Sequence, residues 1–141
     1  MSTELAPVAT ISALATAAQR LIRITPAPTP SSVTLISPTR TIDLQPGWTP
    51  DPVHRLAGLL VWTHSLTGLT GTWWHTEDGH LYISLVGRGP FGVTVNTYSS
   101  IPFRLVKRLV RLPQGERESV TPDELYRLAI ALREQTTEVA A

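Results

Sequence analysis

The chain contains no cysteine, which excludes disulfide bonds, thiolate metal sites and cysteine nucleophiles. Charged residues make up only 16% of its 141 residues and the formal net charge is +1, so no bulk field attracts it to nucleic acid or to an anionic membrane. No uncharged apolar run reaches the roughly 18 residues that a membrane-spanning helix needs. The first 24 residues also lack the positively charged start of a signal peptide. We therefore expect a cytoplasmic protein without membrane contact.

Lysine is nearly absent, since eleven of the twelve basic residues are arginine. With the abundant alanine, threonine and proline, this composition indicates a GC-rich bacterial or phage source. Apolar residues make up 42% of the chain, enough to form the core of one folded domain of this length. We expect a single domain over residues 1–141.

The first half of the chain predicts a helix, a hairpin and a second helix. Apolar residues recur at helical spacing over residues 9–24, and a proline-rich linker at 25–32 follows. Alternating apolar residues predict a hairpin over 33–44, and Asp51-Pro52 predicts the start of a helix that ends near Leu66. That helix has two apolar stripes on nearly opposite sides, one of which contains Trp62. It should be buried on two sides or present one side to a partner.

Residues 72–98 are predicted to form three antiparallel strands. Asp78-Gly79 favours a two-residue hairpin turn between strands 72–77 and 80–86, and a third strand follows at 91–98. Period-two alternation then assigns seven residues to the core face: Trp74, Leu81, Ile83, Leu85, Phe91, Val93 and Val95. The opposite face carries Trp73, His75, His80, Tyr82, Ser84, Thr94, Asn96 and Tyr98.

Two further helices are predicted toward the end. The segment FRLVKRLVRL predicts a helix over 103–112, and Thr121, Pro122 and Glu124 predict the capped start of the last helix. Residues 136–141 are predicted to be a frayed tail. The expected fold class is α+β, an antiparallel sheet of three to five strands with helices packed on one face, in the order α-β-β-α-β-β-β-α-α.

One candidate site is a row of basic residues on the helix predicted at 104–111. Arg104, Lys107, Arg108 and Arg111 are spaced i, i+3, i+4 and i+7, which places them on one side of a helix. Such a row suits contact with phosphates. Alternatively, it is a solvated face that the acidic residues at 116, 118, 123 and 124 neutralise.

A second candidate site is the predicted outer face of the sheet. Its aromatic rings, with nearby amide and imidazole groups, suit a stacked base or a small ligand. Alternatively, the N-terminal helix or another subunit covers this face, or it is a half-polar sheet surface. Trp62 on the second helix is a further candidate for a partner surface.

Histidines give little support for metal binding or catalysis. His75 and His80 are five residues apart but have no third ligand, and His64 is expected to be a core residue, so we expect no metal and no cofactor. No paired carboxylates or activated nucleophile can be argued from spacing. His75, His80 and Tyr82 remain as the least favoured option, a small hydrolase or nuclease site.

These observations favour a small non-catalytic binding or adaptor protein over an enzyme. The leading hypothesis is protein–protein contact, with self-association as a homodimer as one form of it. The alternative is a nucleic-acid-binding module that uses the basic helix and the aromatic sheet face.

Overall fold

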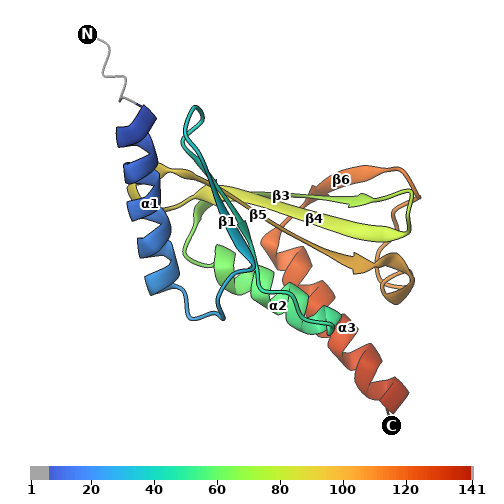
Figure 1. The fold of residues 1–141 in the computed structure, drawn as a ribbon. Helices are drawn as coiled ribbons and strands as arrows, with labels where there is room; N and C mark the ends of the chain where they lie inside the picture. Colours follow the sequence, from blue (N-terminus) through green and yellow to red (C-terminus); the bar gives the residue numbers. More distant parts are fainter. Residues whose placement is uncertain (1–6, 141) are drawn as a thin grey trace.

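The computed structural model describes residues 7–140, which form three helices and a six-stranded sheet (Figure 1). The elements in chain order are α1 (Pro7–Ile24), β1 (Ser32–Ile36), β2 (Thr41–Gln45), α2 (Pro52–Thr63), β3 (Thr67–His75), β4 (His80–Arg88), β5 (Thr94–Pro102), β6 (Arg117–Val120) and α3 (Pro122–Ala140). Single 3-10 turns follow β4 and β5, at Pro90–Gly92 and Phe103–Leu105. The α+β class is confirmed, in the order α-β-β-α-β-β-β-β-α.

The sheet is mixed rather than purely antiparallel. Its strand order is β1-β2-β5-β4-β3-β6, and β2 pairs with β5 in parallel while every other pairing is antiparallel. The predicted hairpin over 33–44 is confirmed, since Val33 pairs with Leu44 and Leu35 pairs with Ile42. β6 was not predicted. It pairs with the edge of β3 immediately before the last helix.

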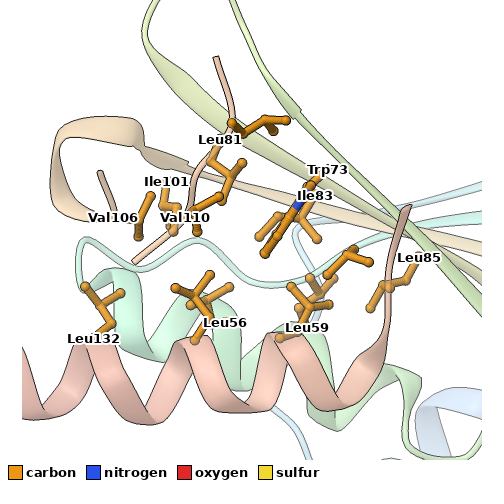
Figure 2. Close-up of a cluster of buried hydrophobic side chains, with 14 residues drawn as sticks. Leu56, Leu59, Trp73, Leu81, Ile83, Leu85, Ile101, Val106, Val110 and Leu132 are labelled. Atoms are coloured by element: carbon orange, nitrogen blue, oxygen red, sulfur yellow. The ribbon is translucent and has the colours of Figure 1, made fainter. Parts of the chain in front are cut away.

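Two hydrophobic clusters fill the space between the helices and one face of the sheet. The larger contains Leu56 and Leu59 of α2, which point toward Trp73 and Ile83 of the sheet (Figure 2). The smaller joins α1 to β2 and β5, and it contains Trp62, which is only 3% exposed. Side chains of the second helix therefore enter both clusters, which is one of the two alternatives that its sequence left open. Because Trp62 is enclosed by the chain itself, the apolar stripe that it marks is not a free partner surface.

The hairpin between β3 and β4 has a three-residue turn instead of the predicted two-residue turn. The Thr76 N–H donates to the His80 carbonyl at 2.9 Å, and Gly79 adopts φ +84° in the left-handed region. This geometry is typical of a three-residue hairpin loop that ends in a bulge. The extra residue shifts the register by one, so Trp73 is buried at 6% exposure and Trp74 faces outward. The predicted faces of these two tryptophans were wrong.

The segment 103–112 is not a helix. Only one 3-10 turn and a few turn hydrogen bonds form, from the Val106 N–H to the Phe103 carbonyl and from the Leu109 N–H to the Val106 carbonyl. Val106, Val110 and Leu112 are all buried in the larger cluster. Packing of these three side chains under the sheet overrides a pattern whose leucine, arginine and lysine residues favour a helix.

Several smaller predictions also change. Phe91, predicted in the core, lies in the 3-10 turn between β4 and β5 and is 67% exposed. His64 is exposed rather than buried. The capping box of the last helix is confirmed, since the Glu124 N–H donates to the Thr121 hydroxyl and the Thr121 N–H to the Glu124 carboxylate, each at 3.1 Å. That helix continues through Ala140, so residues 136–140 are helical, and residue 141 lies outside the described residues.

Residues 25–31 connect α1 to β1 without regular structure. No helix within residues 7–140 combines the length and the apolar character that crossing a membrane requires.

Candidate functional site

The sheet has one covered face and one open face. Buried side chains of all three helices pack against the face that carries Leu81, Ile83 and Val95. Within residues 7–140 no helix covers the opposite face (Figure 1). Strand alternation therefore presents every second residue of the sheet to solvent on that side.

An aromatic row crosses the open face from strand to strand. The pairing register makes Arg117 of β6, Trp74 of β3, Tyr82 of β4 and Ser100 of β5 successive partners. The Arg117 guanidinium lies 4.7 Å from the centre of the Trp74 ring. Tyr82 stacks on Tyr98, with ring centroids 5.9 Å apart and planes 25° apart. The row thus places three aromatic rings on neighbouring strands, two of them stacked, with a cation at its β6 end.

A second arginine lies at the opposite end of this row. The Arg55 guanidinium of α2 donates to the Ser100 carbonyl at 3.1 Å and to the Thr49 carbonyl at 2.6 Å. It also lies 5.4 Å from the centre of the Trp48 ring, which is 74% exposed. Trp48, Arg55, Tyr98 and Ser100 line one hollow of about 70 Å³. We call Trp74, Tyr82, Tyr98 and Trp48, with Arg117 and Arg55 at the ends, the aromatic track.

The polar groups beside the track are mostly paired with each other. The Asn96 amide donates to the Asp43 carboxylate at 2.9 Å, one row away from the tyrosines. Partial burial, and to a smaller extent Tyr98 and Asp43, raise the pKa of the Tyr82 phenol above its usual value. The Tyr82 hydroxyl therefore remains protonated at neutral pH and keeps a hydrogen-bond donor on the track.

The two predicted site histidines lie on opposite faces of the sheet. His75 is on the helix side, where it stacks on Phe103 at 3.6 Å and its Nδ1 lies 2.7 Å from the Leu112 carbonyl. His80 shares the open face with Tyr82, and its Nδ1 lies 3.4 Å from the Asp78 carboxylate. His75, His80 and Tyr82 therefore do not converge on one substrate position.

The acidic partner of His80 belongs to the hairpin turn. The Thr76 hydroxyl, and to a smaller extent His80, lower the pKa of Asp78 below its usual value. No cluster of three or more histidine or carboxylate side chains that could bind a metal occurs among the described residues.

The four predicted nucleic-acid-binding residues are exposed but do not form a helical row. Arg104, Lys107, Arg108 and Arg111 lie in the segment that leaves β5 just after Ser100. No ion pair joins them to an acidic residue within residues 7–140. Two of the expected acidic partners have other contacts, because Glu118 accepts from the Trp73 indole at 2.7 Å and Glu124 caps α3.

A separate apolar surface runs along α2 on the helix side. Hollows of about 510 and 520 Å³ flank this helix, and Pro26 and Val61 line both of them. Trp48 stands on one rim and Tyr126, which is 60% exposed, on the other. The outer side of the helix itself carries the small residues Ala57 and Gly58. We call this surface, with Pro26, Ala57, Gly58, Val61, Trp48 and Tyr126, the α2 groove.

Sequence reasoning placed Tyr82, Tyr98, Asn96 and His80 on the open face but missed both arginines of the track. The pair Trp73-Trp74 indicated that one of two adjacent indoles must face outward, although only the turn geometry decides which. Arg55 and Arg117 carried no sequence pattern that separates them from other surface arginines. The chain matches no family model, no curated protein and no solved structure, so the aromatic track and the α2 groove are the features from which a function can be inferred.

Proposed function

We propose that this is a non-catalytic binding protein that works through protein–protein contacts, and that a second copy of the chain docks in its α2 groove. The observation that supports this most is the pair of contiguous apolar hollows along α2, with an exposed aromatic side chain on each rim. Exposed apolar surface of this kind is typical of interaction sites.

The shape of the groove favours a second copy as the partner. The surface contains both projections, Trp48 and Tyr126, and hollows that can receive them. A two-fold axis near Ala57 and Gly58 would bring the projections of each copy to the hollows of the other, and small residues there allow two helices to approach closely.

The size of the surface predicts a weak dimer. The 12 residues of α2 span about 18 Å. A patch of that length and similar width covers roughly 400 Å² per copy, below the roughly 800 Å² of a standard stable interface. Association should therefore depend on concentration and be measurable in the micromolar range.

Sedimentation velocity over low to high micromolar concentration tests the proposal. The mass of the wild-type protein should rise with concentration, and V61R, which places a charge in the apolar groove, should remain monomeric. V86R is a matched control, because Val86 is a partly exposed valine on the open face of the sheet. A wild-type protein that stays monomeric throughout, or a loss of association in V86R but not in V61R, would refute the α2 groove as the contact.

A further inference from the structure

We propose that the aromatic track binds single-stranded nucleic acid, with bases stacked on its rings and phosphates held by Arg117 and Arg55. Trp74, Tyr82 and Tyr98 lie on the open face of the sheet, and Arg55 and Trp48 reach its β5 end from the α2 side. The track is separate from the α2 groove except at Trp48, which lines both. The inference therefore goes beyond the proposed protein contact.

The ring surfaces fit exposed bases. Tyr82 and Tyr98 already stack on each other, and Trp74 is the cross-strand partner of Tyr82. Every base has a π-face, so a track of rings binds single strands with little sequence preference. Paired bases within a duplex do not offer these faces, so a duplex should bind less well.

The two arginines fit phosphates. The Arg117 guanidinium lies 4.7 Å from the centre of the Trp74 ring, and no hydrogen bond within residues 7–140 engages it, so its donors are available to an oxyanion. Arg55 is fixed by two carbonyl acceptors and by Trp48 at the opposite end of the track. A positive charge at each end of a row of rings is complementary to a strand that alternates bases with phosphates.

The dimensions fit a short stretch of strand. From β6 to β5 the track crosses three strand spacings, or about 14 Å. Sheet surfaces of this kind accommodate two or three stacked bases.

The chemistry of the face favours nucleic acid over a protein partner. The outward neighbours of the rings are hydroxyl side chains, including Thr72, Ser84 and Ser100. The centre of a protein interface is usually more apolar than this.

The surrounding charges predict moderate affinity. The basic residues of segment 104–111 lie at the same end of the sheet as Arg117, but Asp78 and Glu116 also lie at that end. The two arginines of the track should therefore dominate the salt dependence. Two phosphate contacts to a single strand predict a slope of about −1.4 in log K against log salt.

Fluorescence anisotropy with labelled oligo(dT), oligo(U) and a duplex of equal length tests the proposal. Single strands should bind at low salt more tightly than the duplex. The double variant Y82S/Y98S should weaken single-strand binding by roughly fivefold to more than a hundredfold, because each stacked base contributes about 1–3 kcal/mol. Y82F, which keeps the ring, should bind as the wild type does.

The charge contribution has its own matched control. R117Q should reduce the salt slope by about 0.7. R127Q removes an equally charged, exposed residue on the helix side and should leave both affinity and slope unchanged. V61R, which should disrupt the proposed dimer, should bind single strands as the wild type does. The oligonucleotide test therefore does not depend on whether the dimer forms.

Three outcomes would overturn the inference. They are no binding of single strands at low salt, equal affinity for duplex and single strand, and equal losses in R117Q and R127Q. If the wild-type protein binds no oligonucleotide and Y82S/Y98S loses self-association, the open face is assigned to a protein partner instead. Circular dichroism of each variant checks that the fold is intact.

Discussion

Two adjacent tryptophans should lose very different amounts of stability when each is replaced by alanine. Trp73 is buried in the larger cluster and donates its indole N–H to Glu118, whereas Trp74 lies on the open face under Arg117. W73A should therefore destabilise the fold strongly, and W74A only weakly. The comparison tests the one-residue register shift that the three-residue turn imposes on β3.

The expected losses of unfolding free energy do not overlap. Truncating a buried tryptophan to alanine removes about 3–5 kcal/mol of unfolding free energy. Truncating Trp74 loses an exposed cation–π contact of about 0.5–1 kcal/mol. It also loses a cross-strand pair with Tyr82 of about 0.2–1 kcal/mol. W74A should therefore lose at most about 2 kcal/mol.

Urea unfolding followed by circular dichroism measures both values. With a slope of about 2 kcal/mol/M, W73A should lower the midpoint by roughly 1.5–2.5 M and W74A by at most about 1 M. W73F provides a milder control that keeps a ring in the core while removing the indole donor. Equal midpoints for the two alanine variants, or a larger loss for W74A, would refute the assignment of Trp73 to the core face.

Two further predictions concern the turn and the track. G79A should destabilise the protein by about 1–2 kcal/mol, because an alanine at φ +84° is strained even though no atom would clash with its Cβ. An unchanged thermal midpoint in this variant would contradict the strain expected at this position. The raised pKa of Tyr82 means that the folded state retains this proton at a pH where the unfolded state has lost it, so stability should fall as pH rises above about 10. Urea midpoints measured across that pH range should fall less in Y82F than in wild type, and an identical decline in both proteins would contradict the assignment.

The sequence predicted correctly those elements whose structure is determined by residues close to one another in the chain. The last helix has a complete capping box, and the hairpin over 33–44 places Val33, Leu35, Ile42 and Leu44 on one face. In both cases the nearest neighbours in sequence determine the structure. Both apolar stripes of α2 are visible in its sequence, but the sequence left open whether the chain itself or a partner covers the second stripe.

One error arose in a tight turn, and the others arose where distant residues determine the structure. The Thr76 N–H donates to the His80 carbonyl, which makes the loop that ends at Gly79 three residues long, and one residue of shift reverses every side chain of β3. β6 becomes a strand because it pairs with the edge of β3 that β4 does not occupy. The four residues of β6 do not show by themselves that this edge is available. The helical spacing of the basic residues in 103–112 was real, but the buried valines between them fixed another backbone path.

The candidate site was predictable only in part for a similar reason. Tyr82, Tyr98 and Asn96 follow from alternation along β4 and β5. Arg55 and Arg117 reach the track from a helix and from an edge strand, so only the assembled sheet brings them to its two ends. The predicted basic residues at 104–111 lie beside that surface rather than on it.

The parallel pairing of β2 with β5 has a consequence for the order in which the chain folds. β3, β4 and β5 follow one another and pair with their neighbours in sequence, whereas the pairing of Thr41 with Thr94 joins positions that are 53 apart in the sequence (94 − 41) and closes a long loop. The entropy of closing that loop delays the pairing until the central meander exists. Residues 7–45 should therefore join a preformed platform last and detach from it first, as one cooperative unit, without unfolding the remainder.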